Sequence, residues 1–363
     1  MSAHFDTHNP VASTPVQPKL IDKFGRHIDY VRLSVTDRCD FRCVYCMTEE
    51  MIFLPRKEVL TLEEIYQVGR AFTELGVSRL RLTGGEPLVR NNVLALIQAL
   101  GRLPGLRELL LTTNGAQLVQ MAAPLRDAGV NRINISIDSL DADRFKRITR
   151  TGRLDKVLAG IEAARNCNFD RIRLNSVIMK GYNDDEVLQL TGYAVERGLD
   201  IAFIEEMPLG QASDHLREET VCSNDWVLEQ IQQRYTLQST ADNTAGPSRY
   251  YRIPGERSRI GFISPMSHNF CGDCNRVRMT VEGRLLLCLG NEHSADLRKI
   301  LRAGVDENAR KDELAQLEVS EDLPVSGELK TAIIAAMDLK PERHHFYENN
   351  YAQPVRLMNM TGG

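Results

Sequence analysis

The sequence predicts an α/β fold, a partial (βα)6 TIM-like barrel followed by a smaller C-terminal domain. Two observations predict it. Strand-like and helix-like segments alternate from about residue 29 to residue 208, and polar residues gather where several of the strand-like segments end. Segments in that order form parallel strands joined by right-handed crossover helices. Barrels of this kind carry their chemistry at the C-terminal ends of the strands.

The strand-like segments are short and rich in apolar and β-branched residues, as half-buried strands are. There are six of them: Tyr30–Thr36, Arg79–Gly84, Glu108–Thr113, Asn131–Asp138, Arg171–Lys180 and Ile201–Met207. Polar groups follow at Thr83–Glu86, Thr112–Gly115 and Ser136–Ser139. Because a closed barrel of this type has eight strands, six units favour an open, partial barrel.

Segments with the spacing of amphipathic helices lie between these strands. In Leu62–Leu75, apolar residues recur every three or four positions, at Ile65, Val68, Phe72 and Leu75, which is the period of an amphipathic helix. The same spacing predicts helices over Val93–Leu103, Gln117–Ala128, Leu154–Asn166 and Asp185–Arg197.

The alternation ends at about Gly210, and the sequence then changes character. Ser239–Gly246 is polar and rich in turn residues, and Glu307–Glu328 is acidic. Met1–Pro18 contains polar residues and prolines without an apolar core, unlike a signal peptide. We therefore expect a disordered leader over residues 1–18, a barrel over residues 19–210 and a smaller domain over residues 211–363.

Composition excludes some classes of partner. The chain has 363 residues, with 45 basic and 49 acidic side chains and a net charge of −4, which argues against a nucleic-acid-binding surface. No segment approaches the roughly 20 apolar residues needed to span a bilayer. We expect no nucleic-acid partner, no membrane partner and a cytoplasmic location.

A first group of cysteines follows the first strand, at Cys39, Cys43 and Cys46. In a reducing compartment, clustered cysteines are metal ligands more often than disulfides. Three thiolates suit an iron–sulfur cluster, zinc or copper. A structural zinc site needs four ligands, and no histidine or fourth cysteine lies nearby. The group therefore favours a four-iron cluster with one iron open to an external ligand.

A second group comprises Cys271, Cys274 and Cys288. His268 could complete a Cys3His zinc site, so spacing alone leaves zinc and a second cluster as equal alternatives. Arg276 and Arg278 then fall on one side of an alternating strand. Two bidentate anion binders beside the ligands favour an open-iron cluster at a substrate site.

The remaining two cysteines, Cys167 and Cys222, stand alone in the sequence. Isolated cysteines in a reducing compartment pack as small hydrophobic side chains. We expect no chemistry from them.

The first cysteine loop resembles that of the radical S-adenosylmethionine (SAM) superfamily, and Gly84–Pro87 resembles its segment that holds the amino group of SAM. The Phe270–Leu289 segment is similar to the molybdenum cofactor biosynthesis protein A family, the GTP 3′,8-cyclases. Further similar segments are Asp29–Cys39, Arg81–Pro87 and Phe203–Pro208, and the match extends from about Phe24 to the C-terminus.

The resemblance implies a lyase with two [4Fe-4S] clusters, one on each cysteine group, and SAM and GTP as ligands. It implies reductive cleavage of SAM to a 5′-deoxyadenosyl radical, which abstracts the ribose 3′ hydrogen of GTP. The carbon radical then attacks C8, giving 3′,8-cyclo-7,8-dihydro-GTP in the first step of molybdenum cofactor biosynthesis.

The resemblance also assigns residues. Contacts with SAM fall on Tyr45, Gly85, Ser136 and Met207, and contacts with GTP on Arg32, Arg81, Thr112, Arg173, Arg276 and Arg278. At Arg173 the family has lysine, so the charge is kept but the donor geometry differs. The open iron of the second cluster is expected to bind the guanine ring. The terminal Gly362 and Gly363 are expected to reach the active site and assist the radical chemistry.

Partners implied by the resemblance are a reductant or electron-donor protein, the next enzyme of the molybdenum cofactor pathway and, as in many similar enzymes, a second copy in a homodimer. Two alternatives stay open. One is a radical SAM peptide maturase with an auxiliary cluster, although such enzymes usually carry more cysteines in the C-terminal half. The other is a zinc-binding interaction protein without catalytic activity.

Overall fold

The computed structural model describes residues 19–210, 216–241, 246–303, 325–346, 348 and 354–362. The expected leader over residues 1–18 lies outside the described residues, as does Gly363.

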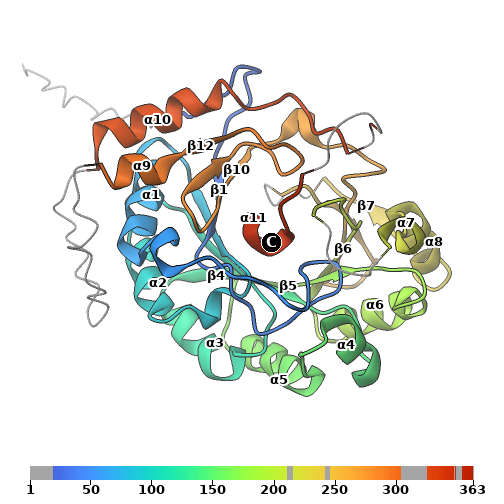
Figure 1. The fold of residues 1–363 in the computed structure, drawn as a ribbon. Helices are drawn as coiled ribbons and strands as arrows, with labels where there is room; N and C mark the ends of the chain where they lie inside the picture. Colours follow the sequence, from blue (N-terminus) through green and yellow to red (C-terminus); the bar gives the residue numbers. More distant parts are fainter. Residues whose placement is uncertain are drawn as a thin grey trace, which may run out of the picture.

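One mixed sheet organises the described residues, in the order β12-β11-β10-β1-β2-β3-β4-β5-β6-β9-β8-β7. The strands from β10 through β1 and β6 to β9 pair in parallel, and the strands beyond them at each edge pair antiparallel. Figure 1 shows the strands curving around a central space with the helices outside. The strands are β1 Tyr30–Ser34, β2 Arg79–Thr83, β3 Glu108–Thr113, β4 Val130–Ser136, β5 Arg171–Val177, β6 Asp200–Ile204, β7 Gln238–Ser239, β8 Arg249–Arg252, β9 Arg259–Ile263, β10 Arg276–Met279, β11 Arg284–Leu286 and β12 Ser294–Asp296.

The helices lie between and after these strands, and those from α1 to α6 connect the parallel strands β1 to β6 in the order that crossovers require. They are α1 Leu62–Glu74, α2 Val93–Gly101, α3 Leu118–Asp127, α4 Ala142–Thr149, α5 Leu154–Arg165, α6 Val187–Glu196, α7 Arg217–Thr220, α8 Asn224–Gln232, α9 Leu297–Leu301, α10 Gly327–Met337 and α11 Met358–Thr361, with short 3-10 helices η1 Arg56–Glu58, η2 Pro87–Val89, η3 Asp184–Glu186 and η4 Cys271–Asp273. At the start of α1, Thr61 and Glu64 cap one another's backbone amides, with hydrogen bonds of 3.1 and 2.8 Å. This capping box begins the helix where the apolar period begins.

The α/β prediction is confirmed, and each expected strand and helix is present within a few residues of its expected bounds. Two features were not expected. Helix α4 precedes α5, and β9 and β10 join the parallel run from a region where the sequence shows no alternation. β9 pairs with β6 and β10 pairs with β1. Strands that follow residue 210 therefore extend the sheet at both of its ends.

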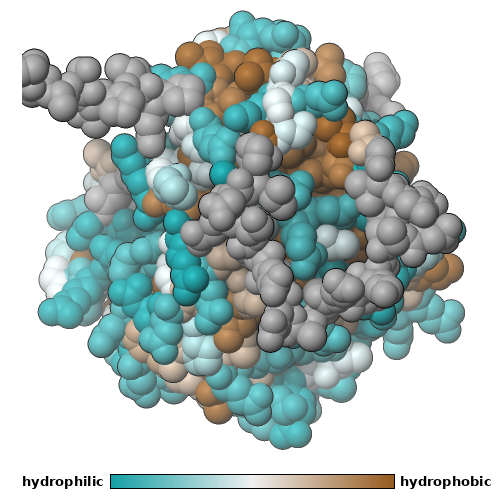
Figure 2. All heavy atoms as spheres, turned by 90° about the vertical axis from the view of Figure 1, so that its left-hand side faces the viewer, coloured by the Kyte–Doolittle hydropathy of each residue, from teal (hydrophilic) through white to brown (hydrophobic). Residues whose placement is uncertain are grey.

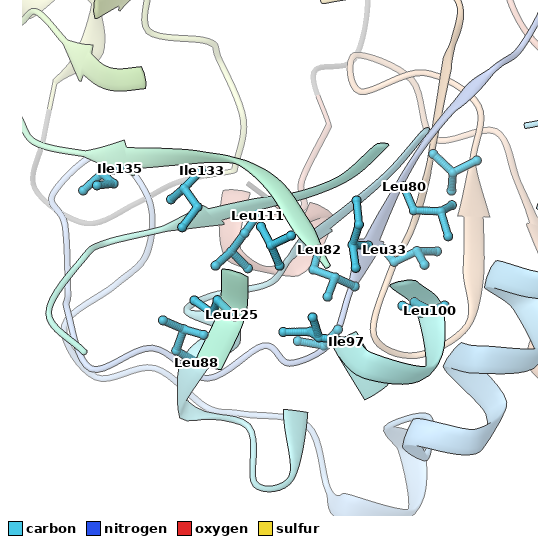
Figure 3. Close-up of a cluster of buried hydrophobic side chains, with 14 of the residues drawn as sticks. Leu33, Leu80, Leu82, Leu88, Ile97, Leu100, Leu111, Leu125, Ile133 and Ile135 are labelled. Atoms are coloured by element: carbon cyan, nitrogen blue, oxygen red, sulfur yellow. The ribbon is translucent and has the colours of Figure 1, made fainter. Parts of the chain in front are cut away.

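The hydrophobic core lies between the strands and the helices. Figure 3 shows leucine and isoleucine side chains of the first strands facing those of the covering helices. Leu80 and Leu82 of β2 are fully buried there, whereas Arg81 between them lines the interior of the barrel. Because successive side chains of a strand point to opposite faces, this packing sets which residues face the interior.

The outer surface is mostly hydrophilic. Figure 2 views the side that carries α1, α9 and α10, and there apolar side chains gather towards the upper edge. Ile334 in α10 and Leu339 just after it are 52% and 53% exposed. None of the described helices is long and apolar enough to cross a bilayer.

Candidate active site

A cavity of about 260 Å³ lies inside the barrel. Its lining includes residues of β1 to β6 and of β8 to β10. Every predicted SAM or GTP contact outside the C-terminal tail lines it, as do the first cysteines: Arg32, Cys39, Cys43, Tyr45, Cys46, Arg81, Gly85, Thr112, Ser136, Arg173, Met207, Arg276 and Arg278. The fold therefore brings side chains from distant parts of the sequence to one cavity.

The first cysteine loop is held by hydrogen bonds to its own sulfur and backbone. The amide of Phe41 donates to Cys39 Sγ at 3.4 Å, and Arg42 Nη1 donates to the carbonyl of Cys39 at 2.6 Å. Asn114 Nδ2 lies 4.0 Å from Cys39 Sγ and donates to Asp40 Oδ1 at 2.6 Å. Asn114 from the end of β3 thus orients the loop that follows β1.

The three thiols of this loop fit a cationic iron–sulfur core. Burial and the neighbouring Cys46 raise the pKa of Cys43 well above its usual value, and burial raises the pKa of Cys46 to about 12. Deprotonating three close, buried thiols is costly unless a metal centre accepts them, since metal binding releases the thiol protons. The three cysteine thiolates at this part of the cavity suit an iron–sulfur cluster.

The adjacent Gly84 and Gly85 pack against this loop. A Cβ on Gly84 would lie 2.5 Å from the carbonyl oxygen of Thr36, and one on Gly85 would lie 2.3 Å from that of Arg38. The amide of Gly85 donates to the carbonyl of Thr36 at 2.8 Å. Because Gly84 and Gly85 have no side chains, the loop after β2 can pack directly against the cysteine loop. This packing requires glycine at both positions whether or not a ligand approaches them.

Buried carboxylates orient their neighbours. Glu86 accepts hydrogen bonds from the amide of Asn114 at 2.6 Å and from Thr113 Oγ1 at 2.8 Å, and burial raises the pKa of Glu86 to about 7. Asp138 accepts from the hydroxyl of Tyr45 at 2.8 Å and from the amide of Val177 at 2.8 Å. These contacts place Asn114 and Tyr45 rather than supply an acid–base pair.

Four arginines crowd the opposite part of the cavity. In the register of the sheet, Arg32 of β1 lies beside Arg81 of β2 and beside Arg278 of β10, and Arg276 lies two residues before Arg278. Burial and the neighbouring Arg276 lower the pKa of Arg278 to about 10, and burial and Arg278 lower the pKa of Arg32. Like charges this close repel one another, and an anion placed among them relieves that repulsion. The arrangement therefore calls for a polyanionic ligand.

Arg173 lines the cavity together with Asn175 and Tyr250. Its Nη1 donates to the hydroxyl of Tyr250 at 2.9 Å, and its Nε donates to Asn175 Oδ1 at 3.0 Å. The guanidinium thus reaches the interior of the cavity.

Sequence reasoning missed several cavity residues, among them Tyr30, Arg132 and Arg171. A signal for two of them was present, because Tyr30 stands two positions before Arg32 and Arg171 two positions before Arg173. Residues two apart on a strand share a face. The alternation that places Arg32 and Arg173 inside the barrel also places Tyr30 and Arg171 there. Applying it two residues further towards the N-terminus would have identified both residues.

Tyr30 gives a prediction about pH. Its hydroxyl accepts a hydrogen bond from Arg81 Nε. Burial opposes ionisation, yet Arg81 and Arg32 prevail and lower the pKa of Tyr30 to about 8. An anion bound to these arginines disfavours the phenolate, so it raises this pKa towards its usual value of about 10. By linkage, the affinity for such an anion falls as the pH rises through 8, by about tenfold between pH 7 and pH 9.

This dependence is checked by measuring the Kd of GTP against pH for the wild type and for Tyr30→Phe. The variant has no phenol to ionise and is expected to give a flat profile over that range. An equal decline in both proteins would assign the effect to another group.

The C-terminal tail enters the barrel. Gly362 accepts hydrogen bonds through its carbonyl from Arg32 Nε at 3.2 Å and Nη2 at 3.0 Å. Its φ is +80°, and a Cβ there would lie 2.6 Å from Thr83 Oγ1. Figure 1 shows α11 and the chain end at the centre of the barrel. The tail therefore reaches the arginine cluster, and Gly363 lies outside the described residues.

The second cysteine group lies beside the cavity rather than on its lining. Burial raises the pKa of Cys288 to about 11. Cys274 differs: burial opposes ionisation, but Lys340 and Arg276 lower its pKa to about 7. The donor set is three thiols at the start of β10 and the end of β11, next to Arg276.

His268 is engaged elsewhere. Its Nε2 lies 2.8 Å from Asp225 Oδ1 of α8. Across the residues that the structure describes, no three His, Cys, Asp or Glu side chains converge on the position of a single metal ion. In this structure His268 therefore pairs with Asp225 and not with the three cysteines.

Comparison with known proteins gives two matching family models. One, described as the radical SAM superfamily, matches residues 33–194, and the other, described as Molybdenum Cofactor Synthesis C, matches residues 199–346. Among solved structures, Streptococcus suis SuiB bound to S-adenosylmethionine has a TM-score of 0.55 at 15% identity. The match covers 78% of this chain and 67% of that one. At this identity the likeness shows the fold alone.

Curated relatives are far more similar. A GTP 3′,8-cyclase of Ectopseudomonas mendocina is 56% identical over 95% of this chain and 99% of its own length. Those of Pseudomonas fluorescens and Marinobacter nauticus are 57% and 55% identical, over 95% and 96% of this chain and 98% and 99% of their own lengths. Identity at this level across both cysteine groups confirms the resemblance read from the motifs. The chain belongs to the GTP 3′,8-cyclase family of the radical SAM superfamily.

Proposed function

We propose that this chain is a radical SAM GTP 3′,8-cyclase, which converts GTP to 3′,8-cyclo-7,8-dihydro-GTP for molybdenum cofactor biosynthesis. Membership of the superfamily implies a [4Fe-4S] cluster and SAM as cofactors. The cluster is assigned to Cys39, Cys43 and Cys46. The observation that carries the proposal is that these cysteines and four arginines line one cavity.

The chain's own residues bind and position the substrate. When bound, the cluster and SAM supply a 5′-deoxyadenosyl radical, and the protein directs its reactivity. We assign the triphosphate to the arginine cluster, with Arg173 at its far side, because guanidinium groups bind phosphate oxygens bidentately. We assign SAM to the wall formed by Tyr45, Gly85, Ser136 and Met207. The cavity inside the barrel would hold the reacting atoms close together and limit their contact with water.

We further propose that Cys271, Cys274 and Cys288 hold a second [4Fe-4S] cluster whose open iron meets the guanine ring. Support comes from the three thiols beside Arg276 and from the engagement of His268 by Asp225. Anaerobically reconstituted protein should contain about eight irons per chain. One or two zinc ions with no acid-labile sulfide would contradict both clusters.

Anaerobic incubation with SAM, GTP and a reductant tests the activity. Cyclised GTP is expected, together with 5′-deoxyadenosine and methionine, and mass spectrometry identifies each. Reactions without SAM are the control. A peptide maturase would cleave SAM without changing GTP. That alternative is disfavoured because relatives at 55–57% identity are GTP 3′,8-cyclases.

The tail gives a second prediction. Deleting Gly362 and Gly363 should abolish cyclisation while leaving iron content unchanged, because the deletion removes the carbonyl that Arg32 contacts but no cysteine. Activity and iron analysis of the truncated enzyme check this. Normal turnover by the truncated chain would show that the tail takes no part.

Partners follow from the chemistry. SAM cleavage consumes an electron, so we propose a reductant or an electron-donor protein, and an enzyme of the same pathway that accepts the unstable product. We also propose that the enzyme acts in the cytoplasm. A homodimer and a separate domain over residues 211–363 remain predictions.

A further inference from the structure

Lys340 is a buried cation that the proposed reaction does not use. It is 1% exposed and lies between α10 and the C-terminal segment. Its Nζ donates to the carbonyl of Leu287 at 2.7 Å, to the carbonyl of Arg276 at 2.9 Å and to Cys274 Sγ at 3.5 Å. An ammonium has three N–H donors, so each one is engaged.

None of these acceptors is a carboxylate, and within the described part of the chain no carboxylate forms an ion pair with Lys340. Lysine is almost never fully buried unless it is paired, because an uncompensated charge in the interior is costly. No carboxylate of the described residues therefore balances Lys340 directly, and the side-chain acceptor that its Nζ meets is the sulfur of Cys274.

Two further cations lie near the second cysteine group, and one of them is balanced by a carboxylate. Arg26 Nη1 donates to the carbonyl of Cys271 at 2.8 Å, and Asp22 balances Arg26 through an ion pair of 2.6 Å. Arg276, whose carbonyl Lys340 contacts, adds another positive charge. An anionic group on the three cysteines would supply a negative charge at the point where Lys340 donates to sulfur.

The contacts of Lys340 also tie together the two parts of the cysteine group. Arg276 follows Cys274 by two positions at the start of β10, and Leu287 directly precedes Cys288. One side chain therefore holds the backbone on both sides of the group while its third hydrogen touches a ligand sulfur.

We propose that Lys340 is a positioning residue that holds the ligand loop of the second cluster and raises the reduction potential of that cluster through charge and an N–H···S hydrogen bond. This inference rests on the second cluster of the proposed function. Hydrogen bonds to cluster sulfurs and nearby charge set the potential of iron–sulfur centres. A cation favours the reduced state, which carries one more negative charge.

A direct test needs no change at Lys340. The full chain with Cys39, Cys43 and Cys46 replaced by alanine retains only the second cysteine group. This protein is labelled with [15N]lysine, reconstituted and reduced, and pulsed EPR then detects nitrogen coupled to the cluster. We expect coupling from a lysine nitrogen. A reduced cluster without lysine coupling would overturn the proposal.

Variants test the energetic role in the same background. Lys340→Met removes the charge at similar length, Lys340→Arg keeps it, and Lys330→Met is the matched control on α10, since Lys330 pairs with Glu74 at the surface. We expect a lower midpoint potential in Lys340→Met, a smaller change in Lys340→Arg and none in Lys330→Met. Loss of the cluster from Lys340→Met with an unchanged apo melting temperature also supports the role.

An unchanged potential in Lys340→Met would overturn the proposal. Should that variant not fold, the [15N]lysine experiment decides. Failure of the proposed second cluster looks different, because the protein with native Lys340 would then bind no iron at this cysteine group.

Discussion

Replacing Arg278 by methionine is expected to stabilise the ligand-free protein while nearly abolishing GTP binding. Burial and the adjacent Arg276 already lower the pKa of Arg278 to about 10, so the folded apo protein bears the repulsion. Replacing a buried ion pair by apolar side chains of similar volume is often neutral or stabilising by about 1–4 kcal/mol, and we expect a gain at the lower end of that range for this single, partly buried guanidinium. Removing one partner of a buried charge pair costs a complex about 2–5 kcal/mol, a fall in affinity of roughly thirtyfold or more.

Denaturant unfolding of the apo protein and calorimetric titration with GTP measure the two effects. Arg153→Met is the matched control, because Arg153 pairs with Asp155 on the exposed surface. It should leave GTP affinity unchanged. A ligand-free Arg278→Met protein that is clearly less stable than the wild type, with unchanged affinity, would show that the arginine cluster is not an anion site.

Replacing Cys43 by alanine is expected to remove about four irons per chain and to reduce SAM cleavage at least about a thousandfold, towards the uncatalysed rate. Two thiolates cannot hold the cluster in the geometry that leaves one iron open. GTP affinity should change little, because the arginines belong to other strands. Iron analysis, assay of 5′-deoxyadenosine and GTP titration separate these effects.

Cys167→Ala is the control for this variant. Cys167 is half-buried, and its thiol donates to the carbonyl of Ala163 at 3.2 Å, away from the cysteine groups. The control should keep its iron and its activity. A Cys43→Ala protein with full iron content would contradict the assignment of the first cluster.

The local order of the chain was readable from the sequence because it depends on short-range patterns. Apolar residues three and four positions apart predicted α1. Short segments rich in apolar and β-branched residues, alternating with such helices, predicted the strands. The C-terminal ends of the strands were therefore known, and with them the position of the first cysteine loop. Short motifs indicated the family and the candidate ligands. The cysteines Cys39, Cys43 and Cys46 lie close together in sequence, and so do Arg276 and Arg278.

What tertiary structure decided is how segments distant in sequence meet. β10 pairs with β1, which places Arg278 beside Arg32, and no local pattern encodes that pairing. The tail returns so that Gly362 contacts Arg32. The burial of Lys340 against Cys274 depends on packing between segments 66 residues apart. Sequence by itself determined the elements and the chemical groups, whereas long-range pairing and burial determined which groups share a cavity and which charges lack a partner. The reason is physical: helix and strand periods are set by neighbouring residues, but desolvation and like-charge crowding arise only after the chain has folded.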